Sequence, residues 1–331
     1  MKILIVGLGS IGQRHTKNLI QLGVEEIGFL RREPTPYLDN PDLPVFTDIE
    51  AALGWGPEVA VISGPTSMHI SSAKVFTGHG VHLFLEKPLS HNWAGVPELI
   101  RIVREKQIQV MVGFDLRFHP SLLRAKSIID EGTLGRIIGA QVQVGQWLPD
   151  WHPWEDYRYG VSAKAESGGG VLRDLVHELD YITWLLGPVE RVACQLSHQS
   201  SLEIETEDIA QCLFTFQSGT KATLHLDYIQ RVATRSCRLI GEEASLEWDG
   251  IASKVRLLSP GGKSAEEWSF DADRNVRYLA EMEALLSMVR DGAPPPVGLE
   301  SAARTLLLEI TARRAAKEEK FLPIPNLEDL L

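Results

Sequence analysis

Cysteine, basic charge and long apolar runs are all scarce in this sequence. The three cysteines, Cys194, Cys212 and Cys237, are odd in number and widely spaced, and no CxxC pair occurs. This pattern suits a reducing cytosol and gives no metal-site signal, so we expect no metal ion. The sequence also has no internal repeat and no low-complexity segment.

Acidic residues outnumber basic ones by 44 to 33, which gives a formal net charge of −11. This charge repels a phosphate backbone, so we expect no nucleic-acid partner. No apolar run has membrane-spanning length, and the opening MKILIVGLG is too short for a signal peptide and lacks a small-residue cleavage site. We therefore expect a cytoplasmic protein with no membrane partner.

A length of 331 residues with 44% hydrophobic and 23% charged residues is typical of a soluble protein with two sizeable domains. In the first third, short apolar runs alternate with helical patterns. The expected strands are 3–6, 27–30, 59–62, 81–85 and 109–114, and the expected helices are 11–22, 68–78 and 93–106. This alternation predicts a parallel sheet covered on both faces, with ligands bound beyond the carboxyl ends of its strands.

The pattern changes after residue 120. Strand-like runs then follow one another, with QSGT at 217–220 as a hairpin turn, and the expected helices lie at 121–132, 170–186, 275–290 and 299–316. Consecutive strands predict a largely antiparallel sheet. We therefore expect an α/β domain over residues 1–119 and an α+β domain over 120–331 with a large, mostly antiparallel open sheet.

The stretch from Gly7 to Gly12 reads GLGSIG, a GxGxxG that follows a strand and opens a helix. The three glycines permit a tight turn, close approach of a pyrophosphate and helix–strand packing, while the helix amino terminus offers N–H donors. We expect a dinucleotide here, bound by Gly7, Gly9, Ser10, Ile11 and Gly12. The alternative is a glycine-rich turn of another α/β protein.

Arg31 and Arg32 follow the second strand, where an acid that holds the ribose 2′-hydroxyl normally lies. A guanidinium suits a 2′-phosphate, so NADP is preferred and NAD is possible. In the alternative interpretation, the arginines are solvated and Glu33 is the acid that holds the ribose 2′-hydroxyl.

The stretch VHLFLEKPLS ends a buried strand with two charges and a proline. Pro88 restricts the backbone of Lys87, whose position at a carboxyl strand end faces the expected cofactor crevice. Lys87 then serves as an acid or base for a hydroxyl proton, with Glu86 as a pairing group. A plain surface lysine is the alternative. Pro65, Thr66 and His69 follow the preceding strand on the cofactor side, although His69 is equally a helix-start residue.

Asp174 and His177 share a stripe of the helix expected over 170–186. A neutral His177 can accept the proton of a reacting hydroxyl, and Asp174 or Asp180 can orient the imidazole. The alternative is a structural His–Asp contact near a helix start.

The preceding loop, 148–169, is long and rich in aromatic residues. Trp151, Trp154 and Tyr157 are candidates for stacking on a sugar, or else the loop packs as a small satellite core or an oligomer contact. Asp115 and Arg117 follow another carboxyl strand end and are candidate substrate contacts, unless they pair with each other.

Several of these stretches together resemble the glucose–fructose oxidoreductase / inositol dehydrogenase (Gfo/Idh/MocA) family over roughly the whole chain. The similar motifs are GLGSIGQRH, SGPTSMHISSA, GVHLFLEKPLS, VGFDLRFHP and ESGGGVLRDLVHELDYITWLLG. The resemblance implies a Rossmann domain followed by a domain with a large open sheet, and oxidation or reduction of a sugar or cyclitol carbon with NAD(P). It also implies that Lys87 is the catalytic lysine and that subunits form sheet-to-sheet dimers or tetramers.

Two departures from the family pattern matter. Asp115 stands where the family more often has asparagine, and Asp174 lies three residues before His177 where many members have a spacing of four. The shorter spacing also resembles a subgroup with a motif like GGGVLLDLSHELDYLRWLFG. It leaves open whether Asp174 is the catalytic partner.

We therefore predict an NADP-preferring dehydrogenase or reductase that acts on a CH–OH group of a sugar, sugar derivative or cyclitol. Lys87 and His177 transfer the hydroxyl proton, assisted by Asp174, and the protein forms a homodimer or homotetramer. Two alternatives are a cofactor-assisted glycosidase or lyase on the same fold, and a cofactor-sensing binding protein without chemistry.

Overall fold

The computed structural model describes residues 1–37, 39–166, 168–261 and 264–331. Contacts divide the chain into two compact units. The first consists of Met1–Asp115, Asn275–Arg304 and Leu327–Leu331, and the second of Leu116–Arg274 and Thr305–Asn326. Each unit combines segments that are distant in the sequence. The predicted division at residues 119 and 120 stays a prediction about domain organisation.

The first unit contains a six-stranded parallel sheet in the order β3-β2-β1-β4-β5-β6. Its strands are β1 (Ile3–Val6), β2 (Ile27–Leu30), β3 (Val45–Phe46), β4 (Val59–Ile62), β5 (His82–Glu86) and β6 (Val110–Gly113). The strand order reverses between β1 and β4, and this switch point is where open α/β sheets bind ligands. The predicted Rossmann arrangement is confirmed.

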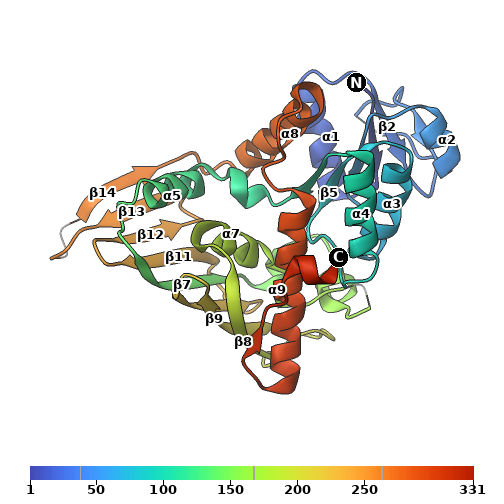
Figure 1. The fold of residues 1–331 in the computed structure, drawn as a ribbon. Helices are drawn as coiled ribbons and strands as arrows, with labels where there is room; N and C mark the ends of the chain where they lie inside the picture. Colours follow the sequence, from blue (N-terminus) through green and yellow to red (C-terminus); the bar gives the residue numbers. More distant parts are fainter. Residues whose placement is uncertain (38, 167, 262–263) are drawn as a thin grey trace. The chain divides into compact units, whose positions relative to one another are not determined.

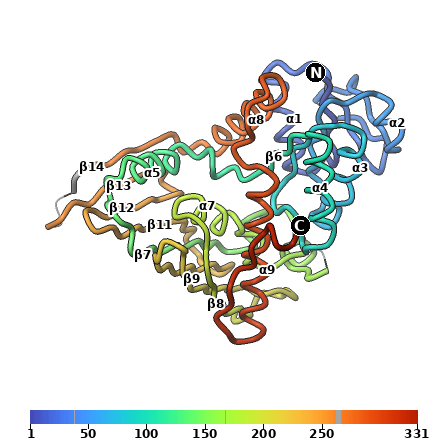
Figure 2. Tube along the Cα trace, viewed as in Figure 1, coloured from blue at the N-terminus to red at the C-terminus, as the bar shows by residue number. Residues whose placement is uncertain are grey.

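Helices of the first unit come from both ends of the chain. They are α1 (Ser10–Gln21), α2 (Ile49–Gly54), α3 (His69–Gly78), α4 (Val96–Lys106) and nearly all of α8 (Arg274–Asp291), with short 3₁₀ turns η1 (Thr66–Met68) and η6 (Leu327–Leu330). α3 packs on β4, β5 and α4 (Figure 1). α8 returns to lie beside α1 (Figure 2). The Asn275 side chain of α8 donates a hydrogen bond to Asn18 Oδ1 at 2.9 Å.

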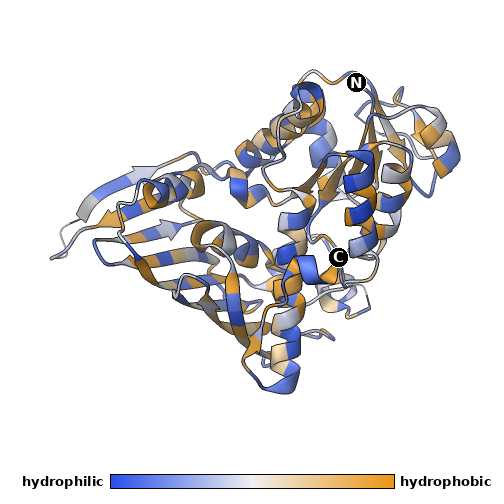
Figure 3. Cartoon of the chain, in the orientation of Figure 1, coloured by the Kyte–Doolittle hydropathy of each residue, from blue (hydrophilic) through white to orange (hydrophobic). Residues whose placement is uncertain are grey.

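The core of the first unit lies on both faces of its sheet. Val59, Ala60 and Val61 on β4 are 0% exposed and Ile62 is 1% exposed. A strand covered on both faces is apolar throughout rather than alternating. Figure 3 accordingly colours these strands mostly hydrophobic. For this reason the strands of the first unit could be predicted from continuous apolar runs in the sequence.

The second unit contains a nine-stranded sheet in the order β14-β13-β12-β11-β7-β10-β9-β8-β15. Its strands are β7 (Ile137–Gly145), β8 (Val189–Ser197), β9 (Ile209–Phe216), β10 (Lys221–Asp227), β11 (Thr234–Gly241), β12 (Ser245–Asp249), β13 (Lys254–Leu258), β14 (Ser264–Ser269) and β15 (Leu322–Pro323). β7 and β10 pair in parallel and the other pairs are antiparallel. This confirms the mostly antiparallel sheet. The hairpin turn is confirmed too, because the Gly219 N–H donates to Phe216 O between β9 and β10.

One face of the second sheet carries helices and the other is open. α5 (Pro120–Asp130) packs on β12 and β13, and α7 (His177–Leu186) packs on β7 (Figure 1). Burial alternates along β9 and β10, as expected for a sheet with one covered face. The remaining elements are α6 (Val171–Asp174), α9 (Leu299–Glu318), which runs through both units, and the 3₁₀ turns η2 (Asp115–Phe118), η3 (Leu148–Asp150), η4 (Tyr157–Tyr159) and η5 (Val161–Ala163).

The prediction of one continuous helix over 170–186 is wrong. The segment forms α6 and α7, with Leu175 outside helical geometry at φ −95° and ψ 32°. Across this junction the Val176 N–H donates to Arg173 O and the Glu178 N–H to Leu175 O, so bonds to the third preceding residue replace bonds to the fourth. The tighter turn changes the angular spacing between Asp174 and His177 from that of a regular helix. Short elements β3, α2, β14 and β15 were not foreseen either.

Candidate functional site

The glycine loop after β1 has no room for side chains on its inner side. A Cβ on Gly12 would lie 2.4 Å from Gly7 O, and one on Gly7 would lie 2.9 Å from Gly64 Cα. Gly7 also has a φ of +93°, which side chains rarely adopt. The Ser63 hydroxyl donates to Gly7 O at 2.8 Å, so the loops after β1 and β4 are joined.

The outer side of this loop is open. A Cβ on Gly9 would meet nothing within 4 Å. Gly9 caps α1 without a side-chain hydrogen bond, and the first turn of α1, beginning at Ser10 and Ile11, contains no acidic residue. Its N–H groups and positive dipole end are therefore available to a pyrophosphate. The residues present fit a dinucleotide at this loop.

The two arginines after β2 differ in their surroundings. Arg31 is half-buried and its Nη1 donates to Thr35 O at 2.6 Å, which ties the side chain to the following loop. Arg32 and Glu33 are exposed. Arg32 presents its charge to solvent at the end of β2, the position that in this fold faces the ribose.

His69 connects the loops that follow β4 and β5. Its ring nitrogens lie 3.0 Å from Gly64 O and 3.0 Å from Pro88 O, and its side chain is 1% exposed. Burial lowers the pKa of His69, and a neutral imidazole donates to only one of the two carbonyls. His69 therefore lies between the backbones of the two loops and contacts both. Pro65 is exposed and Thr66 is half-buried at the start of the same turn.

Glu86 and Lys87 lie at the carboxyl end of β5. Glu86 Oε1 lies 2.6 Å from His15 Nε2, and Oε2 accepts the Lys87 N–H at 3.1 Å. His15 is 0% exposed and Glu86 is 8% exposed, whereas Lys87 is half-buried. The Lys87–Pro88 peptide bond is cis. The charged end of this strand is thus a buried contact to α1 followed by a half-buried lysine.

His15 was not foreseen as part of the site. It lies in the GQRH segment of α1, and its sequence signal was only its place on the buried face of that helix.

Asp115 is held in a buried ion pair with Arg277 of α8. Asp115 is 2% exposed. Glu281, one turn further along α8, is fully buried, and burial raises the pKa of its carboxyl well above the ordinary value, assisted by the charges of Glu86 and Asp115. Asp115 therefore belongs to a charged cluster inside the first unit.

Arg117 forms a two-pronged ion pair with Asp180 in the second unit. Its Nε and Nη2 donate to the two carboxylate oxygens at 2.7 and 2.8 Å. Arg117 is 9% exposed and Asp180 is 1% exposed. Burial raises the pKa of Asp180, although the guanidinium opposes this shift. Asp180 thus binds Arg117, and the Trp184 ring lies 5.1 Å from the same guanidinium.

Asp174 is half-buried and accepts a hydrogen bond from Tyr228. The Tyr228 hydroxyl lies 2.6 Å from Asp174 Oδ2, and the Trp151 ring stands edge-on to Tyr228 at 5.4 Å. Tyr228 is 0% exposed, and burial followed by the charge of Asp174 raises the pKa of its hydroxyl well above the ordinary value. The structure therefore brings together Asp174 and Trp151 through a tyrosine that the sequence interpretation missed. Its only signal was its place after β10.

His177 begins α7 and is 7% exposed. The next residue, Glu178, is fully buried and lies 2.8 Å from Arg235 Nε of β11. This ion pair fixes the first turn of α7 against the sheet, and with it the backbone of His177.

The aromatic loop is divided between buried and exposed side chains. Trp151 is half-buried, and Tyr157 is half-buried with its hydroxyl oxygen accepting the Glu203 N–H at 3.3 Å. Trp154 is 75% exposed and Tyr159 is 80% exposed. Trp151 and Tyr157 are therefore integrated into the second unit, whereas Trp154 projects into solvent. Ser167 of this loop lies outside the described residues.

None of the described helices is both long and apolar enough to cross a membrane.

Two family models match the chain. "Oxidoreductase family, NAD-binding Rossmann fold" covers residues 1–114, and "GFO/IDH/MocA C-terminal domain" covers residues 122–247. The chain is 32% identical over 317 residues to an uncharacterised oxidoreductase of Synechocystis, a match that covers 86% of this chain and 84% of the relative. It is 23% identical to myo-inositol 2-dehydrogenase of Thermotoga maritima, with 99% of each chain covered.

A match of a different activity is 2,7-anhydro-N-acetylneuraminate hydratase of Mediterraneibacter gnavus, 22% identical over 81% of this chain and 73% of the relative. Among solved structures, the WlbA dehydrogenase of Bordetella pertussis, in complex with NADH and UDP-GlcNAcA, has a TM-score of 0.83. It is 20% identical, with 98% of this chain and 99% of that chain covered. At this identity the likeness shows the fold.

Proposed function

Because this chain belongs to the GFO/IDH/MocA family of oxidoreductases, we propose that it is a dehydrogenase or reductase of a CH–OH group in a sugar, sugar derivative or cyclitol. The observation that carries the proposal is Lys87 at the carboxyl end of β5, in the same unit as a glycine loop that fits a dinucleotide. Relatives that are dehydrogenases of inositol support the substrate class. We include in the proposal a cofactor domain at 1–119 and a substrate domain at 120–331.

The cofactor in this proposal is NADP, with NAD as the second choice. When bound, the nicotinamide accepts or supplies a hydride at the reacting carbon. Gly9, Ser10 and Ile11 bind the pyrophosphate by backbone N–H groups, as the open side of the loop and the uncapped helix support. Arg31 and Arg32 contact the 2′-phosphate, since both follow β2 and Arg32 is exposed.

Lys87 holds the proton of the reacting hydroxyl at Nζ. Its backbone N–H is bound by Glu86, which in turn contacts His15, and the next residue's carbonyl contacts His69. These contacts limit the directions in which the lysine side chain leaves the strand. A side chain that is held near one position transfers a proton more effectively than a mobile one.

His177 is proposed as the second proton-transfer group, with Asp174 as its assistant. The ion pair of Glu178 with Arg235 fixes the start of α7, and the hydroxyl of Tyr228 fixes Asp174. Trp151 and Tyr157 supply apolar faces for the substrate, and Asp115, Arg117 and Trp154 remain weaker candidates. For the first two of these three, the ion pairs with Arg277 and Asp180 favour a structural role.

A lyase or hydratase reaction is the second candidate function. The hydratase among the relatives favours it, because that protein shares most of its length with this chain. Such a reaction would leave the oxidation state of a bound cofactor unchanged overall, so substrate would be consumed without net change in nicotinamide absorbance. This outcome separates the two candidates in a single assay.

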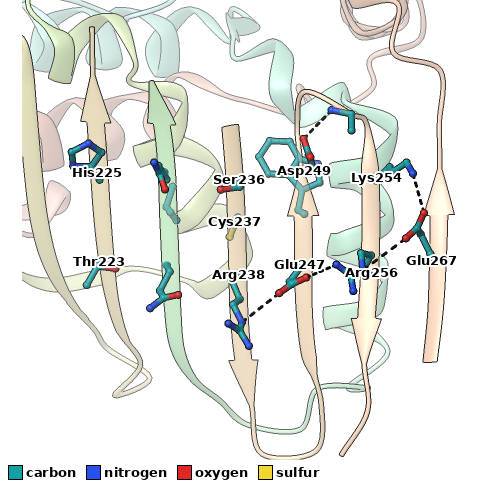
Figure 4. Close-up of a pocket in the computed structure, with 15 residues that line it drawn as sticks. Thr223, His225, Ser236, Cys237, Arg238, Glu247, Asp249, Lys254, Arg256 and Glu267 are labelled. Atoms are coloured by element: carbon teal, nitrogen blue, oxygen red, sulfur yellow. Dashed lines mark hydrogen bonds and ion pairs between the residues drawn. The ribbon is translucent and has the colours of Figure 1, made fainter. Parts of the chain in front are cut away.

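We extend the proposal to a homodimer or homotetramer formed through the open face of the second sheet. Figure 4 shows this face, where Glu247 of β12 lies between Arg238 of β11 and Arg256 of β13, at 3.7 and 3.2 Å. Arg256 also lies 3.8 Å from Glu267 of β14. Rows of charges that are paired within the face are compatible with a second sheet placed against it. Light scattering at low and high salt tests the assembly.

The function is tested by a substrate screen. Sugars, amino sugars, sugar acids, nucleotide sugars and inositols are each assayed with NADP and NAD, with nicotinamide absorbance and substrate consumption both followed. Lys87→Met is expected to lower kcat by about 10²–10⁴-fold on the true substrate. Lys317→Met, at an exposed lysine of α9, is the matched control and is expected to keep full activity. Full turnover by Lys87→Met would remove the lysine from the mechanism.

A further inference from the structure

Two of the three cysteines lie opposite each other on neighbouring strands. Cys194 of β8 pairs with Cys212 of β9 in the antiparallel register, and the strands run side by side in Figure 1. Their Sγ atoms are 3.4 Å apart, with the Cys212 thiol donating to Cys194 Sγ. Both cysteines are free thiols in this structure. Their 18-residue separation in the sequence gave no sign of this contact.

The backbone already provides most of the geometry of a disulfide. Directly opposite residues of an antiparallel pair have Cβ atoms about 4.5–5.5 Å apart, close to the spacing of about 3.5–4.5 Å in disulfides. The sulfur atoms need to approach from 3.4 Å to about 2.05 Å. Side-chain rotation with a small closing of the two strands supplies this movement.

The two thiols differ in their access to solvent. Cys194 is half-buried, whereas Cys212 is 2% exposed. The hydrogen bond to Cys194 and burial raise the pKa of Cys212 well above its ordinary value. Cys212 therefore stays a thiol that donates to its neighbour. Cys194 is the group that meets a reagent from solvent first.

The third cysteine is excluded from this chemistry by its position. Cys237 lies on β11, which is separated from β9 by β7 and β10 in the sheet. It is 2% exposed, and burial followed by the charge of Glu178 raises the pKa of its thiol to about 12. The pairing of Cys194 with Cys212 is therefore specific.

We propose that Cys194 and Cys212 are a site of oxidative modification, at which a low-molecular-weight disulfide such as glutathione disulfide forms a cross-strand disulfide. The Cys194 thiolate attacks the reagent, forms a mixed disulfide and releases one glutathione thiolate. The released thiolate takes the proton of Cys212, whose sulfur attacks Cys194 Sγ and displaces the second glutathione. Two protein thiols are oxidised, and one glutathione disulfide is reduced to two glutathione thiols.

The cross-link restrains the connection between β8 and β9. Near the end of this connection, Asp208 accepts the N–H groups of Gln199 and Ser200 at 2.9 and 2.8 Å. Glu207 O accepts the Val171 N–H at the start of α6. Closing the loop with a covalent bond lowers the conformational entropy of the unfolded chain. We therefore expect oxidation to raise the Tm of the protein by roughly 5 °C.

The test is incubation of the full-length reduced protein with glutathione disulfide, followed by thiol counting in denaturant, intact mass and mapping of linked peptides. The reduced chain has 3 cysteines, and we expect the oxidised chain to retain only the thiol of Cys237, to have lost two hydrogen atoms, and to yield a peptide linked through Cys194 and Cys212. Retention of all three thiols, or a lasting glutathione adduct in place of the cross-link, would overturn the proposal.

Three variants assign the roles of the cysteines. Cys237→Ser is the matched control and is expected to form the cross-link as the parent protein does. Cys212→Ser is expected to stop at a stable glutathione adduct on Cys194, and Cys194→Ser is expected to react little, because Cys212 is buried. Circular dichroism checks that each variant is folded. If a variant does not fold, the peptide linked through Cys194 and Cys212 in the parent protein still tests whether the cross-link forms. Loss of the cross-link in Cys237→Ser would contradict the assignment.

Discussion

At the scale of single residues, Glu281 of the first unit is an ionisable group in the buried interior. It is 0% exposed, and neither carboxyl oxygen has a hydrogen-bond partner among the described residues. His15 and Glu86 lie close by. One ring nitrogen of His15 and one carboxylate oxygen from each of Glu86 and Glu281 all lie within 4.8 Å of one another. The nearby Arg277 is engaged with Asp115. A charged Glu281 would thus be desolvated beside other carboxylates, so the neutral acid is favoured.

Glu281→Gln tests this protonation state through stability. The pKa of Glu281 is raised in the folded state, so its contribution to stability is complete below the unfolded pKa and is lost as pH rises toward the folded pKa. We expect Glu281→Gln to gain in urea stability relative to the parent protein between about pH 5 and pH 8. A constant difference between the two proteins over this range would contradict a raised pKa.

Tyr228 is the residue that positions Asp174. Tyr228→Phe removes the hydroxyl that donates to Asp174 at 2.6 Å and keeps the ring against Trp151. A hydrogen bond to a charged group is worth about 1.5–3 kcal/mol, so we expect kcat/KM on the true substrate to fall about tenfold or more. The pH profile of kcat is expected to change as well, while cofactor affinity stays the same. An unchanged pH profile with lower thermal stability would reduce Tyr228 to a structural residue.

At the scale of elements, the two glycines Gly9 and Gly12 of the turn from β1 into α1 differ in the space around them. The inner side of this turn is packed at Gly12, and the outer side is open at Gly9. Both glycines belong to one sequence motif, and we expect them to be required for different reasons, Gly12 for packing and Gly9 for cofactor binding.

Gly12→Ala and Gly9→Ala form a matched pair on this turn. A Cβ at position 12 would lie 2.4 Å from Gly7 O and 2.7 Å from Ser63 Oγ, so we expect Gly12→Ala to lose roughly 1–3 kcal/mol of unfolding free energy. Gly9→Ala is expected to change stability by less than about 0.5 kcal/mol and to weaken cofactor binding by about tenfold or more. Urea unfolding and cofactor titration measure the two effects. Full cofactor affinity in Gly9→Ala would place the pyrophosphate elsewhere.

At the scale of the whole molecule, cofactor binding and stability are linked. A ligand that binds only the folded state raises the Tm in proportion to its affinity, so thermal unfolding with NADP or NAD reports cofactor preference on the intact chain. The net charge of −11 repels the additional phosphate of NADP. Binding of NADP therefore depends on basic side chains close to that phosphate.

Replacing both Arg31 and Arg32 by alanine tests the preference for NADP. Each charge-assisted hydrogen bond to the 2′-phosphate contributes about 1.5–3 kcal/mol, so we expect the double variant to bind NADP about 10–100-fold more weakly. Its affinity for NAD is expected to stay within about twofold of the parent protein, since NAD lacks the phosphate. Equal affinity of the parent protein for both cofactors would remove the case for these arginines.

Some features of the molecule were available in the sequence because they depend on neighbours along the chain. The continuous apolar run of β4 and the alternation of strands with helices predict a parallel sheet, and GLGSIG between a strand and a helix predicts the cofactor turn. The position of Lys87 at a strand end follows from the same pattern. By contrast, the continuous helix predicted over 170–186, with Asp174 and His177 on one stripe, was wrong, because Leu175 leaves helical geometry. Periodicity does not report such a local change.

Local sterics and hydrophobic periodicity act over a few residues, so the class of fold, the glycine turn and the place of Lys87 could be predicted from the sequence. The partners of the buried side chains, by contrast, could be identified only in the folded molecule. Asp115 meets Arg277 across 162 residues, Arg117 meets Asp180 across 63, and Asp174 meets Tyr228 across 54. Such pairs form because buried charges and hydroxyls must be satisfied once the elements are packed, and that packing is not written in any short segment.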